Sequence, residues 1–250
     1  MANAEIEVSG LMTARGGRPI LENIDLTIGK GRLVALIGPS GCGKTTLMRA
    51  MAGLDAPDRG AVLVDGERAH AALQRGRISM AFQDPALLPW LSCWRNAGWL
   101  ALMRYDQFPT ATVEKFAALV KLDAERDLKR KYPSEISGGE RQRVALIRAL
   151  SARSSVLLLD EPFSALDHGL RVQIVANLRE RLLEASITCV LVTHDLRDAL
   201  HFADEVIGFN VQTARFDKRW PVRLPRIREV RIRDDPSFAD EASELYKWAG

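Results

Sequence analysis

GPSGCGKTT, at residues 38–46, is the stretch around which the whole chain is organised. It follows the apolar run LVALI (33–37) and precedes TLMRAMAG, whose apolar residues recur at helical spacing as far as Gly53. This order predicts a strand, a glycine-rich loop and a helix. Glycines let successive backbone amides point inward, and the start of the helix adds partial positive charge. The stretch therefore predicts a seat for phosphate groups.

The loop fills the pattern G-x-x-x-x-G-K-[ST], the Walker A motif, with Gly38, Gly43, Lys44 and Thr45. Lys44 is expected to reach the β- and γ-phosphates of a nucleoside triphosphate, and the Thr45 hydroxyl is expected to hold Mg²⁺. A chance group of small residues in a turn is the alternative, and the flanking strand and helix argue against it. The remaining expected phosphate contacts are Pro39, Ser40, Gly41, Cys42 and Thr46.

Size and composition narrow the class of protein. The 250 residues suffice for one large domain or for one domain with an insertion. Lys and Arg outnumber Asp and Glu by only 35 to 32, so we expect no nucleic acid as a main partner. The longest apolar runs, such as AGWLALM (97–103), are far shorter than the roughly 18 residues that span a bilayer. The first residues do not resemble a signal peptide.

The three cysteines lack the spacing of metal ligands and fit a reducing cytosol. Cys93 and Cys189 are expected to be small buried hydrophobic residues. Cys42 lies within the phosphate loop, where positive charge is expected to lower the pKa of its thiol.

Polar residues follow three further apolar runs: Gln83 after 78–82, Asp160 and Glu161 after 156–159, and His194 after 187–193. Consecutive apolar residues predict strands that are buried on both faces. Because these strands alternate with helices, we expect an α/β protein with an open parallel sheet and a ligand along its carboxyl edge. The phosphate loop and the four polar residues are therefore expected to meet at that edge.

The other segments are assigned more coarsely. Residues 5–28 read as two strands separated by the turn-like ARGGRP (14–19), and 61–66 as a strand that ends in an Asp-Gly turn. Residues 85 to about 152 are expected to form a mostly helical insertion, with helical spacing over 112–128. Beyond residue 211 we expect a short strand, arginines on a solvated surface or in small accessory packing, and a final helix from Pro236.

Together these motifs resemble an ATP-binding cassette protein, the nucleotide-hydrolysing subunit of ABC transporters, over roughly residues 5–210. The matching motifs are Walker A, the Q-loop at Gln83, the signature ISGGE (136–140), Walker B VLLLDE (156–161), the D-loop SALD (164–167) and the switch histidine His194. The resemblance implies a P-loop NTPase fold with a mixed sheet, an N-terminal antiparallel β subdomain and an inserted α-helical subdomain. It implies an ATPase domain at 1–210 and a C-terminal tail at 211–250.

The resemblance also implies roles at the sheet edge. Asp160, with Thr45 and Gln83, would hold Mg²⁺, as hard oxygen ligands do. Glu161 would polarise the attacking water as general base, and His194 would contact the γ-phosphate. Gln83 would also sense the attacking water and report to the partner. The alternatives are a solvated strand end for Gln83 and a polar cap for His194.

A second group of residues would act on the nucleotide of another subunit. Ser137, Gly138 and Gly139 would bind the γ-phosphate of an ATP that the opposite subunit holds. Asp167 would line the junction, and its alternative role is to cap the following helix. Two cassettes, expected to be copies of one chain, would close head to tail over two nucleotides.

Two positions depart from the usual family pattern. Arg15 stands where family members have an aromatic residue that stacks on adenine, and a guanidinium plane can also stack on a base. Glu140 stands where many members have Gln.

LLPW (87–90) and DDPSF (234–238) look like segments of the importers for nitrate, sulfonate and taurine. Trp90, Trp94 and Trp99 would then line part of a groove for a short helix of the permease. The alternative for all three is a core position in the helical insertion, and this is the expected one for Trp99. The implied protein is an ATPase at the cytoplasmic face of the inner membrane. Its partners would be a membrane permease, a second ATPase subunit and, through the permease, a solute-binding protein outside the cytoplasm. A soluble cassette ATPase acting on nucleic acid or ribosomes, and a non-hydrolytic regulatory module, are the other hypotheses.

Overall fold

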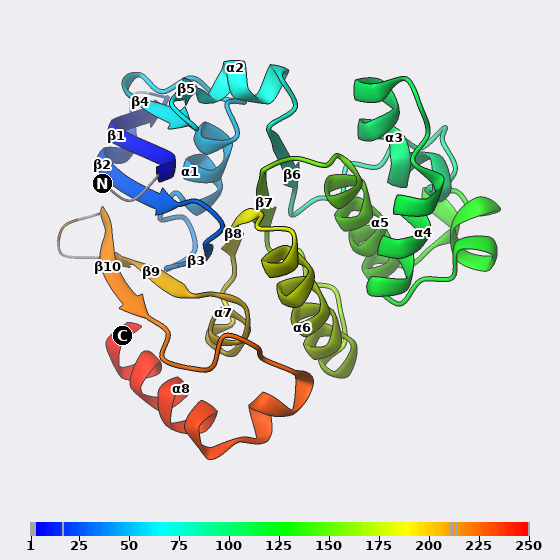
Figure 1. Cartoon of the computed structure of the whole chain (residues 1–250). Coiled ribbons are helices and arrows are strands. Elements are labelled where there is room, and N and C mark those ends of the chain that lie inside the picture. Colours follow the sequence, from blue (N-terminus) through cyan, green and yellow to red (C-terminus); the bar gives the residue numbers. More distant parts are fainter. Residues whose placement is uncertain (1–3, 17, 211–212, 214, 250) are drawn as a thin grey trace.

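The computed structural model describes residues 4–16, 18–210, 213 and 215–249. Its largest element is a six-stranded sheet in the order β10-β9-β3-β8-β7-β6 (Figure 1). The strands are β3 (Leu33–Ile37), β6 (Ile78–Ala81), β7 (Val156–Asp160), β8 (Thr188–Val192), β9 (Glu205–Asn210) and β10 (Arg215–Pro221). All neighbours pair in parallel except β10, which is antiparallel to β9. The prediction of an α/β fold with a mixed sheet is therefore confirmed.

Strand β3 explains why the sequence shows unbroken apolar runs. Leu33, Ala35 and Ile37 belong to the core on the side of the long helices, while Val34 and Leu36 belong to the core on the opposite side. The first core includes residues of α5 (Gly138–Ser151), α6 (His168–Glu184), α7 (Leu196–Phe202) and α8 (Pro236–Ala249). The second includes residues of α1 (Lys44–Met51) and the antiparallel sheet. A strand covered on both faces has no solvent side, so both alternating sets of residues are apolar.

The N-terminal sheet has the order β2-β1-β4-β5. Its strands are β1 (Ala4–Arg15), β2 (Arg18–Gly29), β4 (Arg59–Val64) and β5 (Glu67–Arg68), all antiparallel to their neighbours. In β2 the side chains of Leu26 and Ile28 are buried, and Thr27 between them is exposed, as the alternating sequence predicts. Asp65 and Gly66 have φ of 50° and 77°, the backbone that an Asp-Gly hairpin turn requires.

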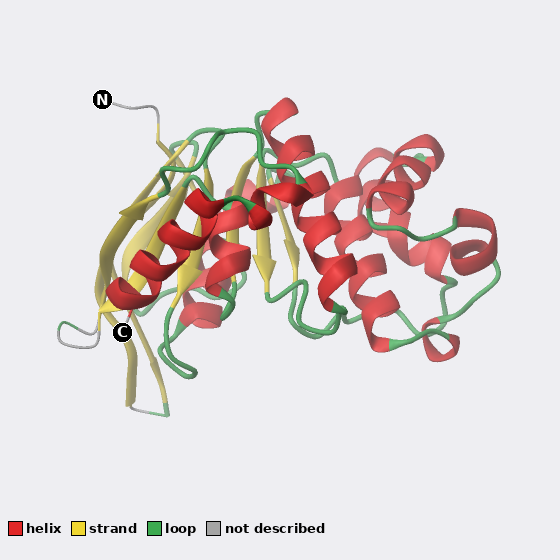
Figure 2. Ribbon diagram, turned by 90° about the horizontal axis from the view of Figure 1, so that it is seen from below, coloured by secondary structure: helices red, strands yellow, loops and turns green. Residues whose placement is uncertain are grey.

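A helical lobe extends to one side of the sheets and joins their core through its last helix (Figures 1 and 2). It contains α3 (Cys93–Tyr105), α4 (Thr110–Leu119), a π-helical turn (Ala124–Lys129) and α5. The helical spacing of 112–128 does not form one helix, because Lys121 has a left-handed backbone and Asp123 caps a new turn through the Arg126 amide. The short helix α2 (Ala69–Gln74) follows β5. Of the helices described, none has the length and hydropathy to span a bilayer.

The C-terminal residues pack against the core of the protein more extensively than the sequence indicates. The expected strand is β10, and the final helix α8 begins at Pro236 as predicted, with Phe238 and Leu245 fully buried. Of the two expectations for the arginines, a solvated surface or accessory packing, Arg228 and Arg233 follow the second, because both are buried. Arg228 donates hydrogen bonds to the carbonyls of Leu200 and Ala203 at the end of α7, so its guanidinium group caps this helix.

His201 is one of the buried titratable groups of this region. Arg233 Nε donates to His201 Nδ1 at 2.9 Å, so Nε2 carries the proton and donates to the Arg228 carbonyl at 3.1 Å. Burial, and then the positive charge of Arg233, lower the pKa of His201 from 6.5 to about 4.

We expect His201→Gln to flatten the acid dependence of stability. Below pH 6.5 His201 is protonated in the unfolded chain, but in the folded chain it stays neutral down to about pH 4. His201 therefore lowers the free energy of unfolding as the pH falls from 6.5 to about 4. The full contribution is on the order of 3 kcal/mol. Glutamine keeps a donor and an acceptor but does not titrate. Urea denaturation at several pH values measures the effect, with His70→Gln, on the surface of α2, as the control.

Candidate functional site

The phosphate loop connects the end of β3 to the start of α1. Gly43 has φ of 97°, and a Cβ on it would lie 2.6 Å from Leu21 Cδ2, so only glycine fits there. Lys44 Nζ donates to the carbonyls of Gly38 at 2.9 Å and Pro39 at 2.8 Å. The ammonium therefore lies within the curl of the loop, and the first amides of α1 face the same space. Both features suit a bound polyphosphate.

The end of β7 places an acidic group beside this loop. The Thr45 hydroxyl lies beside the Asp160 carboxylate, which is nearly fully buried. Burial raises the pKa of Asp160, and the Thr45 hydroxyl, followed by the charge of Lys44, partly offsets this. A buried carboxylate with an adjacent hydroxyl is a hard oxygen donor set that fits Mg²⁺. Within the described residues no group of His, Cys, Asp and Glu could hold a metal unaided, so phosphates and water would complete the coordination.

Glu161 and His194 face each other across the adjacent strand ends. Glu161 has a left-handed backbone, with φ of 47°, and its amide donates to the Val192 carbonyl of β8 at 3.0 Å. His194 Nδ1 lies 3.5 Å from Glu161 Oε2, and the imidazole is mostly exposed. Gln83 lies exposed just beyond β6, at the same edge of the sheet. The structure thus brings together Thr45, Asp160, Glu161 and His194.

The Ser-Gly-Gly turn forms the N-terminus of α5. Ser137 donates from its amide at 2.8 Å and from its hydroxyl at 2.7 Å to Glu140 Oε2, and the Glu140 amide donates back to Ser137 Oγ at 3.2 Å. This is a capping box, and the Ser137 hydrogen bonds lower the pKa of Glu140. A Cβ on Gly139 would lie 2.8 Å from the Ala165 carbonyl, so the turn packs against the D-loop.

Gln142 joins this turn to the D-loop, and sequence reasoning missed it. Its Nε2 donates to Ser164 Oγ at 2.7 Å, and its Oε1 accepts from the Ala165 amide at 3.0 Å. The sequence did contain a signal for Gln142. It lies three positions before Ala145, so helical spacing places its amide side chain on the buried face of the predicted helix. At the end of the D-loop Asp167 caps α6 by accepting from the Leu170 amide at 2.9 Å, as its alternative role predicted.

The expected low pKa of Cys42 is wrong. The side chain is half-buried, and burial raises its pKa more than the charge of Lys44 lowers it. The thiol packs against the loop backbone: a Cβ on Gly38 would lie 2.9 Å from Cys42 Sγ. Cys93 and Cys189 are buried as predicted, and burial raises the pKa of Cys93 to about 11.

The three tryptophans do not form one surface cluster. Trp90 is 70% exposed, whereas Trp94 packs on the core of the helical lobe, with its ring centroid 5.3 Å from that of Phe108. Trp99 is half-buried. Trp94 therefore takes the alternative core position, and the permease groove stays a prediction.

Two buried polar side chains anchor the loop that carries Trp90. Arg148 of α5 donates to the carbonyls of Pro85 at 2.6 Å and Ala86 at 3.0 Å. Asn96 of α3 is fully buried, donates to the Leu88 carbonyl at 3.0 Å and accepts from the Leu88 amide at 2.8 Å. The segment after Gln83 is a loop, but these hydrogen bonds fix it to the helical lobe.

Comparison with known proteins identifies the family. The sequence model described as "ABC transporter" matches residues 21–164. The chain belongs to this family. The cassette is 44% identical to the Fe(3+) ions import ATP-binding protein FbpC of Mesorhizobium japonicum, over 80% of this chain and 56% of the relative. It is 38% identical to the aliphatic sulfonates import ATP-binding protein SsuB 2 of Burkholderia cenocepacia, over 92% of this chain and 82% of the relative.

The chain covers only part of the length of some relatives. The sulfate/thiosulfate import ATP-binding protein CysA of Methylococcus capsulatus is 43% identical over 82% of the cassette and 60% of its own length. The cassette thus spans only 56% to 60% of FbpC and CysA. A dimeric ATP-binding cassette in a post-hydrolysis state with ADP and Pi superposes with a TM-score of 0.79 at 25% identity, over 88% of this chain and 100% of the other.

Proposed function

We propose that this chain is the ATP-hydrolysing subunit of an ABC importer. The observation that carries the proposal is the single sheet edge at which the phosphate loop, the Thr45–Asp160 pair and the Glu161–His194 pair meet. Relatives from three organisms are named as import ATP-binding proteins, which supports the importer class. The residue roles below belong to the same proposal.

Each polar group at the edge has one task in this scheme. Lys44 leaves the carbonyls of Gly38 and Pro39 to contact the β- and γ-phosphates of ATP. Thr45, Asp160 and Gln83 would hold Mg²⁺, whose chemistry is to neutralise developing charge on the phosphates. Glu161 accepts the proton of the attacking water, and His194 donates a hydrogen bond to the γ-phosphate. Arg15, exposed at the end of β1, would stack on adenine.

The nucleotide site is completed by a second cassette. Ser137, Gly138 and Gly139 lie at a helix N-terminus that packs on its own D-loop, and the amides of Gly138 and Gly139 would face an anion from outside the chain. Asp167 would lie at the junction of the two subunits. The dimeric cassette with ADP and Pi supports a head-to-tail pair, and we propose two copies of this chain.

The membrane partner and the solute class complete the proposal. A permease would receive its contact at Trp90, whose loop is anchored on the helical lobe, so that movement of the lobe reaches the membrane. The cassette would lie at the cytoplasmic face, with a solute-binding protein on the other side. LLPW (87–90) and the sulfonate relative support the nitrate, sulfonate and taurine class over iron or sulfate.

The test combines catalysis and partner capture. The purified chain should hydrolyse MgATP, and it should co-purify with a permease subunit from detergent-solubilised membranes. Trp90→Ala should lose the permease and keep ATPase activity, whereas Tyr246→Ala, an exposed aromatic residue on α8, should keep both. Absence of MgATP hydrolysis would contradict the enzyme assignment, and capture that is equal for both variants would contradict the docking assignment.

Glu140→Gln is expected to strengthen ATP-driven dimer formation. The carboxylate already occupies the Ser137 amide and hydroxyl, so an incoming γ-phosphate meets a like charge at the same helix end. Glutamine keeps the capping acceptor without the charge. The ATP concentration for half-maximal dimer, measured by sedimentation, should fall about two- to fivefold.

The matched control for this variant is Glu135→Gln, in the preceding turn, where the carboxylate accepts from the Tyr132 amide at 2.7 Å. It removes the same charge from a neighbouring cap and should leave the half-maximal concentration unchanged. An equal shift in both variants would mean that net charge alone acts.

A further inference from the structure

Arg171 joins two loops that the proposed function uses separately. It lies in the first turn of α6, and its Nη2 donates to the Leu166 carbonyl at 3.0 Å, one residue before Asp167 of the D-loop. Its Nη1 lies 3.5 Å from Asp195 Oδ2, one residue after His194. Arginine suits this position because its planar fork can reach a carbonyl and a carboxylate at once. One side chain therefore connects the D-loop to the switch-histidine loop.

Asp195 fixes the backbone that carries His194. It caps α7 by accepting from the amides of Arg197 at 2.8 Å and Asp198 at 3.2 Å, and its own amide donates to Thr193 Oγ1 at 3.0 Å. These bonds make the residues on both sides of His194 one rigid turn. A shift of the Asp195 carboxylate therefore changes the 3.5 Å separation between His194 Nδ1 and Glu161 Oε2.

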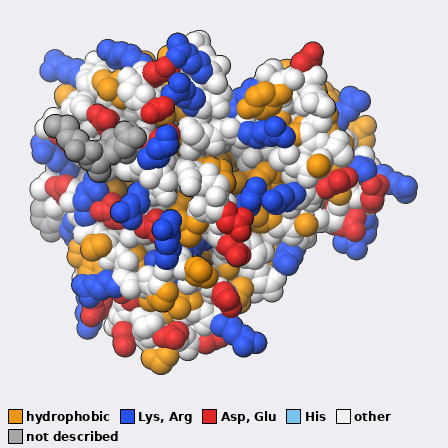
Figure 3. All heavy atoms as spheres, viewed as in Figure 1, with side chains coloured by type: hydrophobic (Ala, Val, Ile, Leu, Met, Phe, Trp, Pro, Cys, Tyr) orange, Lys and Arg blue, Asp and Glu red, His pale blue; other side chains and the backbone are white. Residues whose placement is uncertain are grey.

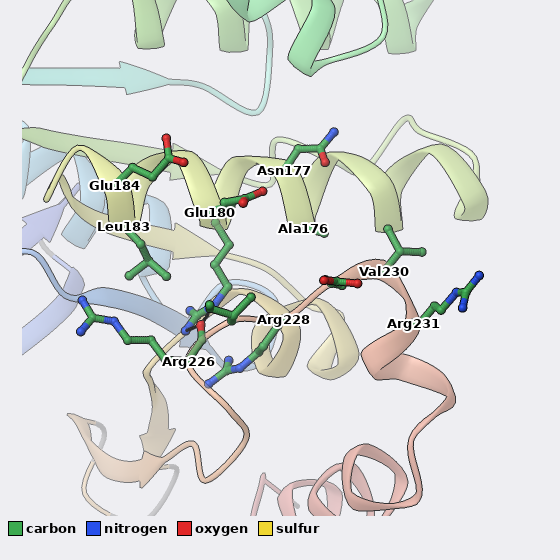
Figure 4. A pocket seen from close by; sticks show the side chains of 12 residues that line it. Ala176, Asn177, Glu180, Leu183, Glu184, Arg226, Arg228, Val230 and Arg231 are labelled. Atoms are coloured by element: carbon green, nitrogen blue, oxygen red, sulfur yellow. Dashed lines mark hydrogen bonds between the residues drawn. The ribbon is translucent and has the colours of Figure 1, made fainter.

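The C-terminal residues support the same carboxylates from behind. Asp198 is buried, with Oδ2 at 3.8 Å from Arg171 Nη1 and Oδ1 accepting from Arg233 Nη2 at 2.6 Å. Arg233 is held in turn by His201. Figure 4 shows the segment 226–231 running beside α6, with a cavity of about 740 Å³ between them. Arg233 therefore braces Asp198, whereas the ion pair of Asp195 is made with Arg171.

We propose that Arg171 is a positioning residue that sets His194 relative to Glu161 according to the position of the D-loop. This rests on the proposed function, in which the D-loop lines the junction of two cassettes. When the second cassette docks, displacement of the Leu166 carbonyl moves the Arg171 guanidinium, and Asp195 and His194 follow. Completion of the dimer is then required for a productive His194–Glu161 pair, so isolated cassettes do not waste ATP.

The experiment compares Arg171→Gln with Arg181→Gln, on the same helix. Arg181 pairs with Glu184 at 3.0 Å on the surface, away from both loops. Arg171→Gln should lower kcat for MgATP by about 10- to 100-fold while KM stays within about twofold. Arg171→Lys should recover part of kcat, because a single ammonium reaches one of the two loops at a time. Arg181→Gln should behave as the wild type.

The outcomes separate this inference from the function on which it rests. A wild type that hydrolyses MgATP, with an equal kcat in Arg171→Gln, overturns the positioning role alone. A raised KM at unchanged kcat also overturns it, because Arg171 would then act in nucleotide binding. Thermal unfolding of each variant checks that it is folded. If Arg171→Gln is unstable, kcat of Arg171→Lys is compared with that of the wild type instead. No hydrolysis by the wild type would contradict the proposed function itself.

Discussion

Replacing Glu161 with Gln is expected to lower kcat for ATP hydrolysis by about 10²- to 10⁴-fold. The carboxylate follows β7 directly, and its backbone is fixed by the hydrogen bond from the Glu161 amide to the Val192 carbonyl. Glutamine has the same size, so the turn and its left-handed backbone are retained while the proton acceptor is lost. Release of phosphate in single- and multiple-turnover assays measures the effect.

The same variant should accumulate as an ATP-bound dimer on gel filtration, because binding is intact and turnover no longer opens the pair. Glu184→Gln, an exposed residue at the end of α6, is the control and should hydrolyse ATP at the wild-type rate. A Glu161→Gln protein that remains monomeric with MgATP and still turns over would remove this residue as the base.

The features that the sequence predicted best are those encoded over short distances. The runs 33–37 and 156–159 are apolar at every position because core lies on both faces of β3 and β7, and this pattern is visible without a structure. Gly43 is predictable for a related reason: its left-handed backbone and its contact with Leu21 exclude every other residue. A motif whose chemistry requires a particular backbone conformation restricts the residue types at its positions, so it can be recognised in the sequence.

The features that were missed depend on partners far along the chain. Arg233 looks like a solvated charge until Asp198, 35 positions earlier, and His201 are seen to receive its hydrogen bonds. Cys42 was expected to be acidic because Lys44 is close, but the degree of burial that raises its pKa depends on tertiary packing. Figure 3 shows acidic and basic side chains interspersed over one face, so charge patterning on the surface carried little positional information.

Two variants, each built on Glu161→Gln, should dimerise less readily with ATP, and each for a different reason. Lys44→Ala removes the ammonium that we propose contacts the phosphates of the nucleotide bound to the same chain. Gly138→Asp leaves the fold intact, because a Cβ there meets only Arg141 Nη2, at 3.9 Å, and an acid suits the first turn of a helix. Its carboxylate would repel the partner's γ-phosphate. Each alone should need about 10- to 100-fold more ATP to dimerise.

Mixing the two variants is expected to restore the ATP-dependent dimer. In the mixed pair the intact phosphate loop of the Gly138→Asp chain faces the intact signature turn of the Lys44→Ala chain, so one complete composite site forms. Gly138→Ala, which adds the Cβ without the charge, should dimerise unaided and serves as the control. If a single subunit enclosed its nucleotide, Gly138→Asp would bind ATP normally and mixing would change nothing. Sedimentation of the mixture therefore decides whether residues 137–139 act on their own nucleotide or on that of the neighbouring chain.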